Sequence, residues 1–330
     1  MSAPASAPAA APKPAAATTT KTRRTRFVCI SDTHNCPVKL PKGDVLIHAG
    51  DLTNQGSCSE LARAVAWLEK AEFECKVVVA AFYAQHGSRF HGRTPQQPDE
   101  CLALLTSSPT ITYLCHASAF VTLRSSKGPC TKFTVFGSPY SPGSGAWAFS
   151  YPYDGTGAED VWSAVPAAAD IVVTHTPPSG HCDWSATRGQ AQGCPSLRRA
   201  LERVRPRLAV CGHVNEGRGA ERVRWDGHAA ELRTEAARRE PRVEFWEDPS
   251  SSRRSAKMAL LDLTARGGGR PLDNDGSVRG LPGQEDKHGG REETCIVNCA
   301  ITATNYPHAD GKRFNKPIVV DLDLPVQEAD

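Results

Sequence analysis

The chain has 330 residues, of which 39% are hydrophobic and 23% are charged, and its formal net charge is +3. This composition is typical of a soluble globular protein, and no apolar run reaches the length of a membrane span. The first 26 residues contain five basic residues and no acid, so the rest of the chain carries a net charge of −2. A near-neutral body argues against a nucleic-acid-binding surface.

The start of the chain differs in composition from everything that follows. Residues 1–25 are rich in Ala, Pro, Ser and Thr, which cannot bury a hydrophobic core, so we expect a disordered basic tail. Its prolines would break the amphipathic helix of a transit peptide, and it lacks the Leu-rich core of a secretory signal. Twelve cysteines occur without any C-x-x-C pair, and several lie inside apolar runs. We therefore expect reduced core thiols and a cytoplasmic protein.

Apolar runs typical of strands recur along the chain, with helical patterns between some of them. The runs lie at 27–30, 44–48, 76–80, 110–114, 120–123, 133–136, 170–174, 208–211, 295–297 and 318–320. Helices are predicted over 59–71, where Leu61, Val65 and Leu68 share one face, and over 195–204. Alternating strands and helices predict a largely parallel central sheet, and the bunched strands in the middle predict a second, mixed sheet.

A charged, Gly-rich stretch interrupts this pattern between residues 227 and 293. Within it, only Met258 to Leu263 is predicted to pair with a sheet. We therefore expect a partly disordered insertion, with the main domain formed by residues 26–226 together with 294–325.

Four of the predicted strands end in residues that can bind a metal ion. The strand-end residues are Asp32 and His34, then Asp51, His175 and His213. Each ending alone is compatible with a turn or a structural histidine, but strand ends of one sheet converge on a single edge. Carboxylates and imidazoles brought together there favour two adjacent divalent ions, with one Asp bridging them. His48 lies within a strand and is predicted to be a core histidine.

The order of these motifs resembles the calcineurin-like metallophosphoesterases and, within them, the small metallophosphoesterase-domain-containing group. The resemblance covers about Arg26 to Trp225 and the final segment from Thr294. The matching segments are RFVCISDTHN, GDVLIHAGDLT, VFGSPYSP, VVTHTPP, CGHVNEGRG and NKPIVVDLDLP. It implies a four-layer α/β/β/α sandwich of two mixed β-sheets flanked by helices.

The resemblance also implies roles for the strand-end residues. Asp32 and His34 would hold a first ion, Asp51 would bridge, and His175 and His213 would hold a second ion, the metals being Mn, Mg, Fe or Zn. A water activated by both ions would attack a small-molecule phosphate ester, and relatives act on phosphodiesters such as cyclic nucleotides. Ser138 would lie near the mouth of the site, unless it is only a turn residue. No nucleic acid or membrane partner is implied, and nothing in the sequence indicates the oligomeric state.

Two departures from the family pattern affect this site. Where the family has G-H-x-H, this chain has Asn215 in place of the second His, which should weaken the first metal site. The family's G-N-H-D or G-N-H-E motif is missing after Ala80, which removes a ligand Asn from the second site and the His that protonates the leaving group. His86 is a candidate stand-in, although a surface or helix histidine is the preferred interpretation.

Four interpretations remain open. The first is a metal-dependent phosphoesterase with impaired activity. The second is a catalytically inactive relative that binds a nucleotide or another phosphorylated ligand. The third is that the loop exists in the cell and was lost from the sequence by a mispredicted splice junction between Ala80 and Ala81. The fourth is an α/β domain without a metal site, which four strand-end ligands in order argue against.

Overall fold

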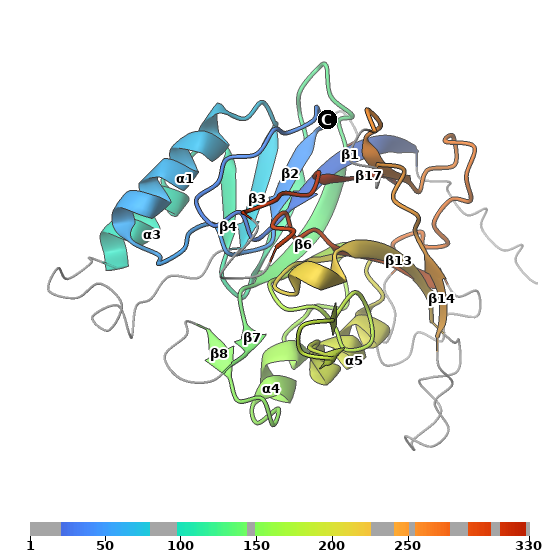
Figure 1. Cartoon of the computed structure of the whole chain (residues 1–330). Coiled ribbons are helices and arrows are strands. Elements are labelled where there is room, and N and C mark those ends of the chain that lie inside the picture. Colours follow the sequence, from blue (N-terminus) through green and yellow to red (C-terminus); the bar gives the residue numbers. More distant parts are fainter. Residues whose placement is uncertain are drawn as a thin grey trace, which may run out of the picture.

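The computed structural model describes residues 21–79, 98–143, 149–225, 241–250, 255–277, 290–304 and 311–327. The predictions that concern Ala80, Ala81 and His86 lie outside these residues. Two large β-sheets lie face to face through the middle of the molecule (Figure 1).

The first sheet has six strands in the order β15-β17-β1-β2-β3-β4. Neighbours from β1 to β4 are parallel, whereas β17 runs antiparallel to β1, so the sheet is mixed. The strands are β1 (Thr22–Ile30), β2 (Val45–His48), β3 (Cys75–Val79), β4 (Ile111–Leu114), β15 (Ala259–Asp262) and β17 (Ile318–Pro325).

The second sheet has seven strands in the order β14-β13-β16-β12-β9-β6-β5. Its central strands β16, β12, β9 and β6 are parallel, and antiparallel strands flank them on both sides. The strands are β5 (Ala117–Thr122), β6 (Lys132–Ser138), β9 (Ile171–Thr174), β12 (Leu208–Cys211), β13 (Gly219–Arg224), β14 (Arg242–Phe245) and β16 (Glu293–Asn298). Short pairs are formed by β7 (Ser141–Pro142) with β8 (Ser150–Tyr151) and by β10 (Trp184–Ser185) with β11 (Gln190–Ala191).

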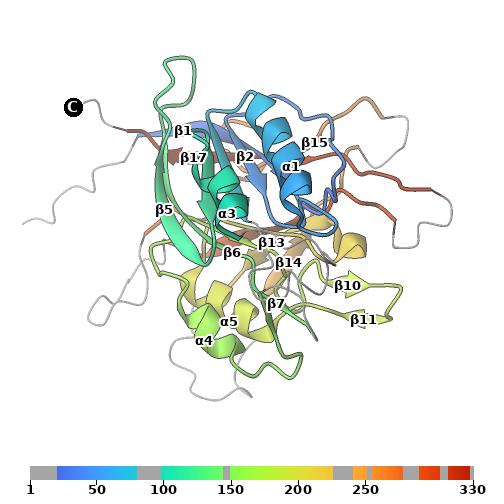
Figure 2. The same ribbon diagram turned by 90° about the vertical axis from the view of Figure 1, so that its left-hand side faces the viewer.

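Helices cover the outer face of each sheet, which gives the four-layer α/β/β/α sandwich that the resemblance implied. Figure 2 shows α1 (Cys58–Lys70) and α3 (Pro98–Thr106) on one side, and α4 (Ala158–Ser163) and α5 (Pro195–Val204) on the other. The predicted face of Leu61, Val65 and Leu68 is the buried face of α1. Ser57 and Glu60 close the start of this helix by binding each other's backbone N–H groups, which satisfies donors that the first turn leaves unpaired.

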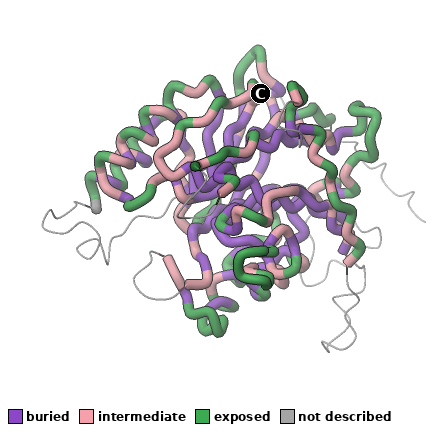
Figure 3. The backbone as a smooth tube through the Cα atoms, in the orientation of Figure 1, coloured by how far each residue is buried: buried purple, intermediate pink, exposed green. Residues whose placement is uncertain are grey.

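Alternate side chains of one strand enter different cores. Phe27 and Cys29 of β1 lie in the core between the two sheets, whereas Val28 and Ile30 lie in the core beneath α1 and α3. A third core joins the seven-stranded sheet to α4 and α5. Because both faces of each central strand are covered, these strands are continuous apolar runs rather than alternating ones. The buried residues accordingly concentrate in the middle of the molecule (Figure 3).

The structure corrects one expected boundary and adds one strand that was not expected. β1 begins at Thr22 and pairs with β17 as far as Pro325, so residues 22–25 belong to the sheet and not to the tail. β15 lies in the predicted pairing segment, but β14 also pairs, and the sequence analysis missed it. β14 is an exposed edge strand with several polar residues, so it lacks the apolar run by which central strands are recognised. The remaining domain boundaries stay a prediction.

Two observations bear on the class of protein. Within the described ranges, no helix is long and apolar enough to cross a membrane. No disulfide joins any of the twelve cysteines, all of which the structure describes.

Candidate metal centre

The carboxyl ends of strands from both sheets meet at one place. Asp32 and Asp51 follow β1 and β2 of the six-stranded sheet, and His175 and His213 follow β9 and β12 of the seven-stranded sheet. The approach is close enough to require glycine. A methyl group on Gly50 would overlap the His175 ring, and one on Gly212 would overlap the Asp32 carboxylate. The predicted convergence of these strand ends is therefore present.

Asp51 lies at the middle of the cluster. Potential ligand atoms of Asp32, Asp51 and His175 all lie within 4.8 Å of one another. One oxygen of Asp51 lies 3.5 Å from His175 Nε2, and the other lies 3.7 Å from His34 Nε2. The Asp51 side chain is 42% exposed, so solvent or a ligand can reach it. A carboxylate with one imidazole at each oxygen has the arrangement expected of a bridge between two ions.

Backbone carbonyls orient both imidazoles. His175 Nδ1–H donates to the carbonyl of Ala49 at 3.0 Å, and His34 Nδ1–H donates to the carbonyl of Thr53 at 3.4 Å. A carbonyl can only accept, so Nδ1 carries a proton in each case and Nε2 faces Asp51. This is the tautomer that a metal ligand needs, held by a partner behind the ring.

Asp32 is 2% exposed and is held from two sides. Its carboxylate accepts the Ser31 hydroxyl at 2.5 Å and the His213 backbone N–H at 3.0 and 3.2 Å. Burial raises the pKa of Asp32, although the nearby His175 lowers it in part and Asp51 raises it further. Two carboxylates are thus brought together with few donors, an arrangement that a cation would stabilise.

Burial and neighbouring charges also shift the pKa values of Asp51 and His213. Burial would raise the pKa of Asp51, but His175, His34 and His213 outweigh it and lower the value. Burial lowers the pKa of His213 to about 4, with a further contribution from His175, whose ring lies 4.9 Å away between centroids. His213 is therefore neutral at physiological pH, as a ligand imidazole must be.

Asn215 supplies an independent test of whether a metal fits. It begins the single-turn helix η1 (Asn215–Gly217), immediately beyond His213. Its side-chain oxygen Oδ1 is buried and accepts no hydrogen bond in the described parts of the chain. A buried acceptor without a donor is costly, and coordination to a cation would satisfy it. The prediction that Asn215 and His34 share one ion stays a prediction.

Backbone strain concentrates at these strand ends. The φ angles of Asp32, His34, Asp51 and His213 are 54°, 45°, 53° and 66°. A non-glycine residue in the left-handed region costs about 1–3 kcal/mol, and such residues gather at functional sites. These turns redirect the chain directly after each strand and bring the side chains to the common edge.

Two other predictions concern residues near the cluster. His48 is fully buried against the Thr33 hydroxyl, as expected of a core histidine, and burial lowers its pKa to about 3. Ser138, expected at the mouth of the site, is also fully buried. Its hydroxyl lies 3.1 Å from His116 Nδ1. A role for Ser138 near the mouth of the site stays a prediction.

The sequence analysis missed His116 itself. This residue follows β4 by two positions, just as Asp32 follows β1, so the same strand-end rule would have found it. It was overlooked because none of the motifs that carry the resemblance includes it.

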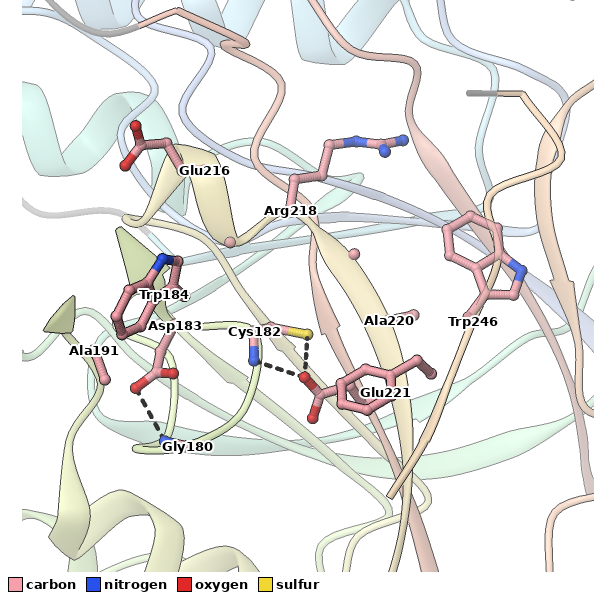
Figure 4. Close-up of a pocket in the computed structure, with 13 residues that line it drawn as sticks. Gly180, Cys182, Asp183, Trp184, Ala191, Glu216, Arg218, Ala220, Glu221 and Trp246 are labelled. Atoms are coloured by element: carbon pink, nitrogen blue, oxygen red, sulfur yellow. Dashed lines mark hydrogen bonds between the residues drawn. The ribbon is translucent and has the colours of Figure 1, made fainter. Parts of the chain in front are cut away.

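A hollow of about 600 Å³ is lined in part by Trp184, Glu216, Phe245 and Trp246 (Figure 4). Its carboxylates already accept hydrogen bonds. Asp183 accepts from the backbone of Gly180 and Gly193, Glu216 from Ser185 and Thr187, and Glu221 from Cys182 and His181. These carboxylates are therefore satisfied by neighbouring groups of the protein.

A sandwich of two mixed sheets with carboxylates and imidazoles at the meeting strand ends is the architecture of a calcineurin-like metallophosphoesterase. Sequence comparison agrees. The chain is 34% identical over 217 residues to human metallophosphoesterase domain-containing protein 1, covering 59% of this chain and 62% of that protein. It is 31% identical over 212 residues to a UPF0046 protein of Caenorhabditis elegans, covering 59% of this chain and 70% of that protein. The chain belongs to the calcineurin-like metallophosphoesterase family, in the group of these relatives.

Other comparisons are more limited. A protein of Emericella nidulans named rhamnogalacturonate lyase C is 38% identical over 207 residues, which cover 61% of this chain but 18% of that protein. The chain thus spans less than two thirds of the length of this relative and of the human one. Among solved structures, purple acid phosphatase PPD1 of yellow lupin seeds aligns with a TM-score of 0.30 and 13% identity, over 62% of this chain and 39% of that one. No protein-family model matches the chain.

Proposed function

We propose that this protein is a metal-dependent phosphoesterase that hydrolyses small phosphate esters, with phosphodiesters such as cyclic nucleotides as the substrate class. Its activity is reduced by the two departures described above. The observation that carries the proposal is the position of Asp51, whose carboxylate lies between His34 and His175 and close to Asp32, at an exposed meeting point of strand ends.

In this proposal the donors divide into two ligand sets. Asp32, His34 and Asn215 would hold the first ion, His175 and His213 would hold the second, and Asp51 would contribute to both. Bound there, the ions would supply an acidified water and neutralise charge on the phosphoryl group. Imidazole and carboxylate donors suit zinc, iron or manganese, and the amide oxygen of Asn215 favours the harder manganese or magnesium at the first position.

The protein's own residues contribute orientation. The carbonyls of Ala49 and Thr53 hold the two imidazoles in the ligand tautomer, and Ser31 and the His213 backbone fix the buried Asp32 carboxylate. The exposed edge of Asp51 leaves the phosphate ester a path to the cluster. The segment that carries the leaving-group acid in relatives is absent after Ala80, so poor leaving groups should react slowly.

The same absence favours a second candidate, a protein without catalytic activity that binds a nucleotide or a phosphorylated ligand at the cluster. The two candidates differ in turnover and share the need for a metal. A cytoplasmic location agrees with the twelve cysteines that form no disulfide and remains our prediction.

The test is hydrolysis of bis(p-nitrophenyl) phosphate by the full chain, with and without added manganese. We expect turnover that depends on manganese and that falls at least about 10²-fold in Asp51→Asn, because the shared ligand holds both ions. Asp160→Asn, on the exposed side of α4, is the matched control and should keep full activity. Manganese binding without turnover in the folded parent protein would support the binding candidate instead.

A further inference from the structure

His116 continues the line of polar strand ends beyond Asp51. It stands just past β4, which neighbours β3, which in turn neighbours β2. Adjacent strands are about 4.8 Å apart, so the ends of β2 and β4 are separated by about 10 Å. Its φ of 54° is in the left-handed region, as for the residues of the metal cluster. His116 therefore lies on the same edge as the cluster, on the side of β3 and β4.

Neighbouring groups hold the His116 ring in a defined position. Its centroid lies 5.3 Å from that of Phe136 and 5.2 Å from that of Tyr140, with both contacts edge-to-face. Ser138 links the ring to the cluster, since its hydroxyl contacts His116 Nδ1 and its backbone carbonyl accepts the N–H of His175 at 3.2 Å. A single residue thus positions both His116 and a proposed metal ligand.

The contacts also indicate where the ring proton lies. The Ser138 hydroxyl oxygen accepts the Tyr140 backbone N–H at 3.4 Å, and in the described contacts His116 Nδ1 is the one acceptor within reach of the hydroxyl proton. The hydroxyl therefore donates to His116 Nδ1. Burial lowers the pKa of His116, so the neutral ring carries its one proton on Nε2. No residue in the described ranges makes a hydrogen bond to Nε2, and the side chain is half-buried. The ring therefore offers a preorganised N–H donor on the same sheet edge as the cluster.

We propose that His116 Nε2–H donates a hydrogen bond to the departing ester oxygen of a phosphate ester bound at the cluster. This role rests on the proposed phosphoesterase function. A fixed donor stabilises negative charge as it develops on the leaving group and needs no rearrangement during the reaction. The donor matters most when the leaving oxygen is strongly basic, and it matters little for a nitrophenolate.

The test uses methyl aryl phosphodiesters whose leaving groups run from p-nitrophenol to phenol, with manganese and the full chain. His116→Phe keeps a ring between Phe136 and Tyr140 but removes the donor. We expect it to lower kcat by about 10²–10³ for the phenyl ester and by less than about tenfold for the nitrophenyl ester. His116→Gln, which retains an N–H, should recover part of the phenyl-ester rate. Tyr153→Phe, at an exposed tyrosine outside these contacts, is the control and should change neither rate.

The leaving-group dependence separates this role from a structural one. An equal fall for both esters would mean that His116 acts through the fold or the metals, and unchanged rates would remove it from the reaction. Either result overturns the inference while the proposed function stands. If the unaltered protein hydrolyses no ester with manganese, the proposed function fails and the role of His116 fails with it.

A second measurement does not depend on activity. Nitrogen-15 NMR of the metal-free protein reports which ring nitrogen carries the proton, and the His116 signals are those that disappear in His116→Phe. We expect the proton on Nε2. A proton on Nδ1 would leave no donor for the substrate and would overturn the inference.

Discussion

Two histidine–carboxylate groups, one in the hollow and one in the candidate metal centre, differ in how far the carboxylate is satisfied. In the hollow, Glu221 is 2.8 Å from His181 Nδ1 and also accepts the backbone N–H of Cys182 at 3.0 Å. In the metal centre, His175 and His34 stand 3.5 and 3.7 Å from Asp51, beyond ordinary hydrogen-bond distance. The Glu221 side chain is 8% exposed and that of Asp51 is 42% exposed.

This difference distinguishes a histidine–carboxylate pair that stabilises the fold from one that is open to a ligand. Glu221 has donors on both oxygens, so no further group is needed there. The Nδ1 protons of His175 and His34 are used by the carbonyls of Ala49 and Thr53, so both Nε2 atoms face Asp51. Burial lowers the pKa of His175, but Asp51 and Asp32 outweigh it and raise the value, so a proton on Nε2 stabilises this contact in the metal-free protein. A metal ion would take the place of that proton. The same residue types therefore form a closed pair at Glu221 and an open, cation-binding arrangement at Asp51.

The largest expected effect on the rate of hydrolysis comes from restoring the Gly-Asn-His-Asp segment that this chain lacks. Insertion of Gly-Asn-His-Asp and its following loop after Ala80 should raise hydrolysis of cyclic nucleotides by about 10²–10⁴, because it supplies a general acid for a poor leaving group. The rate for bis(p-nitrophenyl) phosphate should rise far less, and the ratio of the two rates is the measurement. Equal gains would mean that the insertion acts only through metal occupancy. An in-frame transcript encoding these residues between Ala80 and Ala81 would show that the cell already makes the longer form.

Replacing Glu221 or Asp51 by its amide should have different consequences, the first for stability and the second for metal content. Glu221→Gln should lower the free energy of unfolding by about 1–3 kcal/mol, since it leaves a buried donor of His181 or Cys182 without its charged acceptor. Its metal content should not change. Asp51→Asn should lose metal and should destabilise the metal-free protein less than Glu221→Gln does, because the nearest ring nitrogens described around the Asp51 carboxylate lie 3.5 and 3.7 Å away. Urea unfolding and elemental analysis of both variants test this. A metal-free Asp51→Asn protein as unstable as Glu221→Gln would contradict the distinction.

The smallest expected effect is on metal retention at the first proposed ion position. The parent protein should retain fewer than two equivalents of metal after dialysis against a mild chelator, because Asn215 is a weak neutral ligand and the second site lacks its Asn. Asn215→His should tighten retention roughly tenfold, a size typical of improving one group at a metal site. Gln190→His, which places a histidine on the exposed strand β11, is the control and should not. Two tightly held zinc ions in the parent would show that neither departure weakens the centre.

The sequence by itself determined the parts that depend on local pattern. Continuous apolar runs identified the central strands, and the buried face of α1 followed from the spacing of Leu61, Val65 and Leu68. The metal cluster was also predictable, because a residue that directly follows a parallel strand must lie at the carboxyl edge of its sheet.

Only the tertiary structure decided which groups satisfy one another. The tautomer of His175 depends on the carbonyl of Ala49, 126 positions away in the chain, and the burial of Ser138 depends on its contact with His116. The edge strand β14 and the pairing of His181 with Glu221 were likewise invisible in the sequence. The physical reason is the range of the interactions. Side-chain periodicity records burial within one element, whereas hydrogen-bond partners are chosen only when the two sheets pack and bring distant strand ends within about 3 Å of each other.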